Sequence, residues 1–148
     1  METCRRIEEL VAFIAGRYSN AAEIGIGHFP DVAFELLKSR VSVFATDIRP
    51  FRYPGLNVIF DDITEPDLAL YRGIKLIYSM RPPPELIPYM KRLASQIPAD
   101  CIIKPLSDEY PGGKLIRHGG TTFYLWKFLN NIVDNEAEGN LLIGNPLW

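Results

Sequence analysis

The stretch Ala22-Glu23-Ile24-Gly25-Ile26-Gly27 decides the fold, because it predicts a strand that runs into a glycine-rich turn. The strand is expected over residues 22–26, and the two glycines allow a sharp turn and the close approach of a ligand. A helix that begins at Pro30 would point free N–H groups at that ligand. This order of strand, glycine turn and helix predicts a nucleotide-type site at the end of the first strand.

The rest of the chain alternates short apolar strands with helices, which predicts a mainly parallel sheet covered on both faces. An amphipathic helix is expected at about 4–16 and another helix after the prolines 82–84, whereas residues 65–72 fit at most two helical turns. No helix is expected between the second and third strands, where Pro50 and Pro54 lie. Further strands are expected at 41–45, 57–60, 74–78 and 101–106, with a closing hairpin at 114–118 and 121–126. We therefore expect an α/β fold with three layers, Rossmann-like and methyltransferase-like, that has an N-terminal helix and a terminal antiparallel β-hairpin.

The length of 148 residues indicates a single Rossmann-like domain, 1–148. Its core is expected at about 20–126, followed by a C-terminal extension at about 127–148. The apolar tail 141–148 has two interpretations. It packs onto its own domain, or it binds a protein partner or a second copy of the chain as a homodimer.

Charge and composition exclude several classes of function. The chain has 16 Lys and Arg against 18 Asp and Glu, a formal charge of −2, whereas nucleic-acid-binding domains often have a pI above about 9. The two cysteines, Cys4 and Cys101, form no C-x-x-C pair, and two histidines are too few for a typical metal site, so no metal is expected. No apolar run approaches the roughly 18 residues of a membrane span. These features predict a reduced, cytoplasmic protein without a membrane partner. They disfavour a nucleic-acid partner and leave only a small RNA-facing patch open.

Acidic side chains follow the strands at positions that suit a nucleoside. Asp47 follows Gly25 by 22 positions, and dinucleotide folds place an acid that binds the ribose hydroxyls after about 20 residues. The nicotinamide pattern G-x-G-x-x-G is broken, however, because Pro30 stands where the third glycine belongs. Another class of nucleoside ligand is therefore favoured.

The pattern Glu23-Ile24-Gly25-Ile26-Gly27 resembles the first motif of class I S-adenosylmethionine-dependent methyltransferases. The resemblance implies that Glu23 supports the methionine amine, that Asp47 binds the ribose and that Asp62 binds the adenine amine. Asp61 is the neighbouring candidate, and a plain solvated turn is the alternative for both aspartates.

A nearer resemblance is to an uncharacterised archaeal family of small Rossmann-like proteins related to these methyltransferases. It is carried by the same glycine turn and by the segment Ser79-Met80-Arg81-Pro82-Pro83-Pro84-Glu85-Leu86. This resemblance implies the fold and an archaeal cytoplasm rather than an activity.

The segment after the fourth strand, Ser79-Met80-Arg81, holds no general base, so no catalytic residue is assigned. Arg81 can bind a phosphate or carboxylate through its planar guanidinium, or it forms a surface ion pair with Glu85. Methyl transfer depends mainly on alignment of the reactants, so the missing base does not exclude catalysis.

The sequence thus predicts a small-molecule nucleoside-type ligand, S-adenosylmethionine or S-adenosylhomocysteine, bound by Glu23, Gly25, Gly27, Asp47, Asp62, Ser79 and Arg81. Two alternatives stay open. One is another nucleotide or dinucleotide with Arg81 on a phosphate, and the other is a non-catalytic partner or structural protein.

Overall fold

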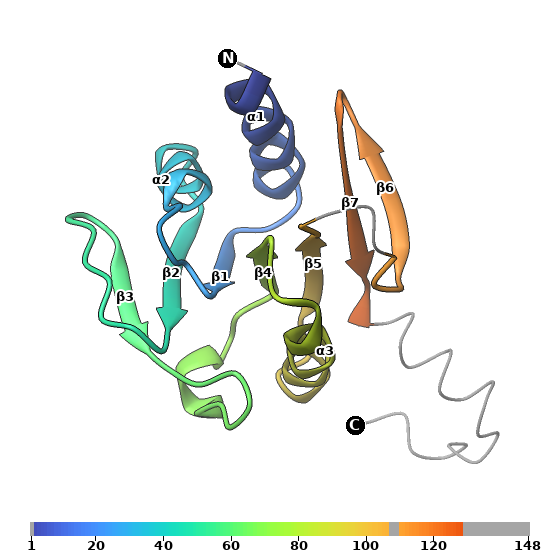
Figure 1. The fold of residues 1–148 in the computed structure, drawn as a ribbon. Helices are drawn as coiled ribbons and strands as arrows, with labels where there is room; N and C mark the ends of the chain where they lie inside the picture. Colours follow the sequence, from blue (N-terminus) through green and yellow to red (C-terminus); the bar gives the residue numbers. More distant parts are fainter. Residues whose placement is uncertain (1, 107–109, 129–148) are drawn as a thin grey trace, which may run out of the picture.

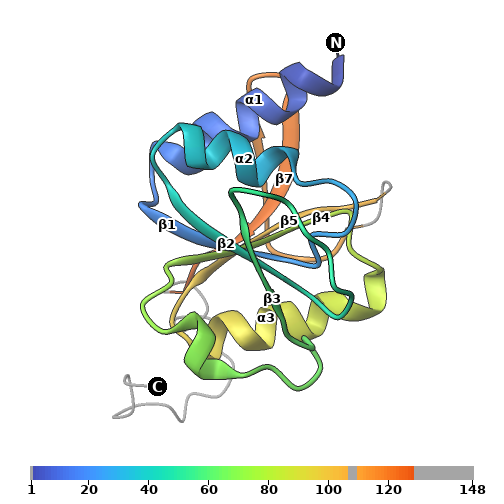
Figure 2. The ribbon, with the colours of Figure 1, turned by 90° about the vertical axis from the view of Figure 1, so that its left-hand side faces the viewer.

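The structure is a computed structural model that describes residues 2–106 and 110–128. Within these residues a seven-stranded sheet forms the middle layer, with helices on both of its faces (Figures 1 and 2). This arrangement confirms the predicted three-layer α/β fold.

The sheet is mainly parallel and ends in an antiparallel hairpin. Its strands are β1 Asn20–Ile24, β2 Ser42–Asp47, β3 Asn57–Phe60, β4 Leu76–Met80, β5 Asp100–Lys104, β6 Lys114–His118 and β7 Thr121–Trp126. The order across the sheet is β3-β2-β1-β4-β5-β7-β6, and β7 runs antiparallel to β5 and to β6. The strand order reverses between β1 and β4, and ligands of open α/β sheets bind at such a reversal.

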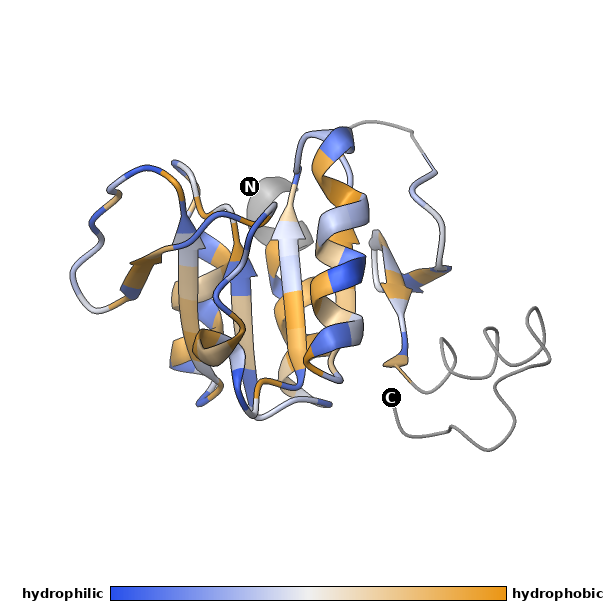
Figure 3. Cartoon of the chain, turned by 90° about the horizontal axis from the view of Figure 1, so that it is seen from below, coloured by the Kyte–Doolittle hydropathy of each residue, from blue (hydrophilic) through white to orange (hydrophobic). Residues whose placement is uncertain are grey.

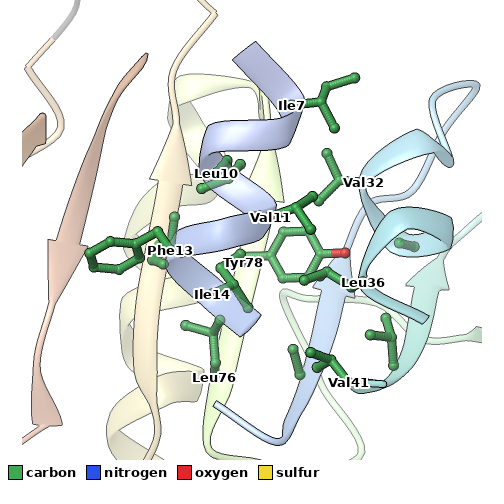
Figure 4. Close-up of a cluster of buried hydrophobic side chains, with 14 of the residues drawn as sticks. Ile7, Leu10, Val11, Phe13, Ile14, Val32, Leu36, Val41, Leu76 and Tyr78 are labelled. Atoms are coloured by element: carbon green, nitrogen blue, oxygen red, sulfur yellow. The ribbon is translucent and has the colours of Figure 1, made fainter. Parts of the chain in front are cut away.

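Helices α1 (Glu2–Ala15) and α2 (Asp31–Lys38) cover one face of the sheet. The predicted amphipathic character of α1 is confirmed, because one side of the helix is buried against the sheet and α2 (Figure 4), namely Ile7, Leu10, Val11, Phe13 and Ile14. Leu76 and Tyr78 of β4 lie in the same cluster. The glycine turn thus lies between β1 and helix α2, and α2 packs against α1.

The opposite face is covered by α3 (Ile87–Gln96), with the short 3₁₀ turns η1 (Leu68–Tyr71) and η2 (Pro84–Leu86) beside it. Met90, Leu93 and Ala94 of α3 pack against apolar strand residues, among them the buried thiol of Cys101. Figure 3 shows hydrophobic and hydrophilic bands alternating along α3, as expected for a helix with one face on a sheet. Cys101 lies in the apolar run Cys101-Ile102-Ile103, which agrees with its buried position.

Several boundaries differ from the sequence prediction, and each difference has a local cause. β1 ends at Ile24, not at residue 26, because Gly25 leaves the strand with a φ of 70°. β4 spans residues 76–80 and not 74–78, and β5 ends at Lys104 because Pro105 has no N–H for the ladder. Helix α2 begins at Asp31, so Pro30 is its cap and not its first residue. The bounds of β3, β6 and β7 agree with the prediction.

The connections are short. Residues 48–56, between β2 and β3, contain no helix, as predicted. Residues 65–72 hold a single 3₁₀ turn, η1. At its start the Asp67 side chain accepts a hydrogen bond from the Ala69 N–H. Of the predicted C-terminal extension only residues 127 and 128 are described, so the tail 141–148 and the contacts predicted for it lie outside the described residues. No described helix is both long and apolar enough to span a membrane.

Candidate functional site

A cleft of about 470 Å³ opens at the carboxyl ends of β1, β2 and β4. Its volume lies within the range of about 300–1,000 Å³ that is typical of ligand sites. Six of the seven predicted site residues line it, namely Gly25, Gly27, Asp47, Asp62, Ser79 and Arg81. Residues that lie far apart in the sequence are thus gathered at the reversal of strand order.

The glycine turn forms the β1 side of the cleft. Gly25 and Gly27 have φ values of 70° and 53°, a region that side-chain-bearing residues adopt with strain. The N–H groups of Gly25 and Ile26 both donate to the carbonyl oxygen of Thr46, at 2.9 and 3.1 Å. No atom lies within 4 Å of the place where a Cβ would stand on Gly25. The turn is therefore fixed to β2 while its outer side stays free for a ligand.

Asp47 is the last residue of β2 and holds this turn in place. Its Oδ2 accepts a hydrogen bond from the Gly27 N–H at 2.9 Å, and its Oδ1 accepts one from the Arg49 N–H at 2.9 Å. Each carboxylate oxygen has two lone pairs, so each can accept one further hydrogen bond. The carboxylate is thus oriented to receive two neighbouring hydroxyl groups.

The two aspartates after β3 have different surroundings. Asp61 is buried, and its oxygens accept from the Tyr71 hydroxyl at 2.5 Å and from the Asp67 N–H at 3.0 Å. The interpretation of this pair as a solvated turn is therefore wrong for Asp61, which ties the loop to η1.

Asp62 is partly exposed, and its Oδ1 accepts from the N–H and the hydroxyl of Thr64, at 2.9 and 2.8 Å. The backbone hydrogen bond from Thr64, followed by the hydroxyl, lowers the pKa of Asp62 below its usual value. Its other oxygen, Oδ2, has no partner among the described residues. A charged carboxylate with a free oxygen is thus available at the rim of the cleft.

Glu23 does not line the cleft. It is fully buried on the face of the sheet that α1 and α2 cover, in register with Ala45 and Tyr78. By strict geometry neither Glu23 oxygen nor the Tyr78 hydroxyl has a hydrogen-bond partner among the described residues, but the Tyr78 hydroxyl lies close enough to Glu23 to oppose part of the effect of burial on its pKa. Figure 4 shows the Tyr78 ring among the side chains of the two helices. Burial raises the pKa of Glu23 to about 8 and also raises the pKa of Tyr78. At neutral pH the Glu23 carboxyl is mainly protonated, and its predicted role at a methionine amine stays a prediction.

The segment after β4 closes the remaining side. The Ser79 hydroxyl is buried and donates to the Ile24 carbonyl oxygen at 2.8 Å, which joins the ends of β4 and β1. Arg81 is exposed, has a φ of 55° and donates its backbone N–H to the Lys104 carbonyl oxygen at 2.7 Å. The surface ion pair between Arg81 and Glu85 does not form, since no such contact is present between these two described residues.

Sequence reasoning missed His28, which follows the glycine turn, and the residues of the β2–β3 loop. His28, Arg49 and Phe51 also line the cleft, and the rings of His28 and Phe51 meet edge to face with centroids 4.8 Å apart. The Tyr53 hydroxyl donates to the Gly27 carbonyl oxygen at 2.5 Å. In the sequence, the only indication of this packing was that the loop contains aromatic residues beside its two prolines. The loop thus covers the glycine turn in place of a helix.

Within residues 2–106 and 110–128, no group of three or more His, Cys, Asp or Glu side chains is placed to hold a metal ion. The polar side chains that line the cleft are carboxylates, arginines, His28 and the hydroxyls of Thr46, Thr64 and Ser79.

Solved structures define the class of fold. DesVI from Streptomyces venezuelae superposes with a TM-score of 0.54 and 11% identity, over 80% of this chain and 59% of DesVI. The sugar N-methyltransferase KedS8 from Streptoalloteichus sp ATCC 53650 gives a TM-score of 0.54 and 14% identity, over 81% of this chain and 58% of KedS8. The chain thus spans about three-fifths of the length of these two structures. Its fold is methyltransferase-like, as predicted.

The sequence comparisons define the family. Residues 7–127 match the uncharacterised protein family UPF0146, and the chain belongs to that family. A UPF0146 protein from Archaeoglobus fulgidus is 40% identical over 119 residues, which are 79% of this chain and 92% of that protein. UPF0146 protein MJ0688 from Methanocaldococcus jannaschii is 41% identical over 110 residues, 70% of this chain and 80% of that protein. The predicted relation to an archaeal family with a methyltransferase-like fold is confirmed.

Proposed function

We propose that this protein binds S-adenosylmethionine or S-adenosylhomocysteine in the cleft at the ends of β1, β2 and β4. The observation that carries the proposal is the Asp47 carboxylate, which the Gly27 and Arg49 N–H groups hold beside the glycine turn. This carboxylate is positioned to accept hydrogen bonds from the two hydroxyls of a ribose. Asp62, with one free oxygen, would then accept a hydrogen bond from the adenine amine.

The glycine turn fits the remainder of such a ligand. The open side of Gly25 lets the backbone approach the ligand, and the cleft wall also offers apolar surface from Ile24, Ile63 and Met80. A mostly apolar wall with a few placed polar groups is the usual composition of a small-molecule site. The residues present therefore fit an adenosine linked to an amino-acid tail.

Catalysis is the second part of the proposal. A bound S-adenosylmethionine supplies an activated methyl group, so the protein would need chiefly to align an acceptor with it. Arg81 and Ser79 cannot serve as a base here, because arginine stays protonated and the Ser79 hydroxyl is buried on the Ile24 carbonyl. We therefore propose binding of the nucleoside as the primary function and transfer to an acceptor that has little need of a base. A cytoplasmic place in the cell is part of the same proposal, supported by the free thiol of Cys101.

Calorimetric titration with S-adenosylmethionine and with S-adenosylhomocysteine tests the proposal, with ATP and NAD as competing ligands. We expect heat of binding for the two S-adenosyl compounds. No heat for either at high concentration would overturn the proposal. Binding of ATP or NAD in their place would instead support the alternative nucleotide function.

Two glycine variants separate the ligand cradle from backbone strain. Gly25→Ala and Gly73→Ala both place a Cβ at a positive φ, 70° and 81°, and in both cases no atom lies within 4 Å of it. Only Gly25 lines the cleft. We expect similar losses of stability for the two variants and a loss of S-adenosylhomocysteine binding for Gly25→Ala alone. Equal affinities in both variants would remove the glycine turn from the proposed site.

A further inference from the structure

Arg81 is a cationic side chain that lines the cleft at the end of β4, and the adenosine contacts proposed above make no use of it. Those contacts lie toward the ends of β2 and β3, where Asp47 and Asp62 stand. Arg81 follows β4, on the other side of β1 in the sheet order. The cleft therefore has the two carboxylates and Arg49 toward the ends of β2 and β3, and the Arg81 guanidinium on the β4 side.

The backbone at Arg81 is held in an unusual conformation. Its φ of 55° lies in the left-handed region, which costs a residue with a Cβ more than it costs glycine or asparagine. The hydrogen bond from the Arg81 N–H to the Lys104 carbonyl, at 2.7 Å, fixes this turn on one side. On the other side Pro82 is buried and is followed by two more prolines, whose φ angles are restricted. The hydrogen bond and the prolines thus restrain the backbone from which the Arg81 side chain extends.

Arg40 provides an internal comparison, because it also has a left-handed backbone, with a φ of 66°. Arg40 follows the end of α2, and its N–H donates to the Leu37 carbonyl at 3.0 Å, so the turn that ends the helix accounts for its conformation. Arg81 follows a strand and ends no helix. The left-handed backbone of Arg81 therefore forms the turn by which the chain leaves β4 at the edge of the cleft.

The guanidinium of Arg81 has no carboxylate partner among residues 2–106 and 110–128. Within the described part of the chain, ion pairs join Lys38 to Glu35, His118 to Glu9 and Lys127 to Asp100, and none of them involves Arg81. A planar guanidinium binds carboxylate and phosphate groups through two parallel hydrogen bonds. Arg81 can therefore accept an oxyanion without first breaking an internal ion pair.

We propose that Arg81 binds an oxyanion, a carboxylate or a phosphate, of a second substrate that lies beside the nucleoside in the cleft. This inference rests on the proposed function, since it takes the positions of Asp47 and Asp62 to be used by the adenosine. It assigns an anionic acceptor to the protein. The guanidinium would position this substrate in the same cleft as the glycine turn.

The test uses inorganic phosphate as the probe on protein saturated with S-adenosylhomocysteine, with the thermal midpoint as the readout. Sodium chloride at equal ionic strength controls for screening. Arg81→Asn removes the guanidinium while keeping a residue that tolerates the left-handed backbone. Arg40→Asn makes the same change at the second left-handed arginine, outside the cleft.

We expect phosphate to raise the midpoint of the unaltered protein and of Arg40→Asn, with at least about tenfold weaker phosphate binding in Arg81→Asn. S-adenosylhomocysteine affinity should stay within about twofold in Arg40→Asn, which lies outside the cleft. An Arg81→Asn protein that still responds to phosphate like the unaltered protein would overturn the inference.

A second series separates the acceptor from the tail of the nucleoside itself, which carries a carboxylate of its own. 5′-Methylthioadenosine lacks that amino-acid tail. If Arg81→Asn weakens S-adenosylhomocysteine at least about tenfold but leaves 5′-methylthioadenosine unchanged, Arg81 binds the tail and the inference is overturned. If the unaltered protein binds no S-adenosylhomocysteine, the proposed function fails; if it binds the nucleoside but gives no phosphate response, only this inference fails.

Discussion

The buried carboxyl of Glu23 makes a specific prediction about stability and pH. Its oxygens have no hydrogen-bond partner in the described structure, and burial raises its pKa from 4.5 to about 8. Between these two pH values the folded protein holds a proton that the unfolded chain has released. The free energy of unfolding therefore falls as the pH rises from 4.5 to 8 and becomes constant above 8.

The size of the effect follows from the shift. Each pH unit well inside this window costs up to about 1.4 kcal/mol of stability for one group. Between pH 5 and pH 8, Glu23 should lower the free energy of unfolding by about 3–4 kcal/mol, because the slope flattens near each pKa. That is a large fraction of the 5–15 kcal/mol that is typical of a domain.

Glu23→Gln keeps the shape of the side chain and removes the titration. At pH 5 we expect this variant to lie within about 1 kcal/mol of the unaltered protein, and at pH 8 to be more stable by about 3–4 kcal/mol. Glu8→Gln is the control, because Glu8 is exposed on α1. Urea unfolding at both pH values measures the differences directly.

An equal difference between Glu23→Gln and the unaltered protein at pH 5 and pH 8 would refute the reasoning. It would mean that Glu23 ionises in the folded state as it does in the unfolded chain. The same variant tests the predicted contact of Glu23 with the methionine amine. Since Glu23 does not line the cleft, we expect its S-adenosylhomocysteine affinity to stay within about twofold at pH 6.

Three further predictions concern the cleft and the sheet edge. Asp47→Ala should weaken S-adenosylhomocysteine roughly 5- to 150-fold in calorimetry, and an unchanged affinity would exclude the ribose contact. Tyr71→Phe removes a hydroxyl that donates to the buried Asp61, so urea unfolding should show a loss of about 1–3 kcal/mol; no loss would mean that water replaces the hydroxyl. Gly113→Ala would bring a Cβ to 2.7 Å from Trp126 at a φ of 77°, so the thermal midpoint should fall by several degrees, and an unchanged midpoint would show that the indole moves aside.

Hydrophobic patterning predicted the sheet well where strand ends coincide with turn residues. The hairpin was predicted with its observed bounds because Gly119-Gly120 marks the turn and apolar residues flank it. The predicted end of β1 was two residues too late, because Ile26 is apolar and almost fully buried although it lies beyond the strand. Apolar character reports burial, whereas the end of this strand is set by the left-handed backbone of Gly25.

The site was predicted less completely than the fold, for a related reason. Spacing placed Asp47 and Asp62 at the ends of their strands, and both line the cleft. Spacing alone did not show that the side chain of Glu23 points to the face covered by α1 and α2 and away from the cleft, because one position along a strand reverses the face. The left-handed conformation of Arg81 and the packing of Phe51 depend on contacts between distant segments, which no local pattern encodes.

The polar groups around the cleft divide into one set that stabilises the fold and one set that is available to bind a ligand. Asp61 and Ser79 are buried, and their hydrogen bonds join η1 to the β3 loop and β4 to β1. Asp62 and Arg81 stand at the rim, with an oxygen and a guanidinium that have no described partner. Removing a buried bond should lower stability, whereas changing a rim group should alter binding with little effect on folding. Asp47 belongs to both sets, since its carboxylate fixes the glycine turn and can accept further hydrogen bonds from a ligand in the cleft, so its variants should lose stability and affinity together.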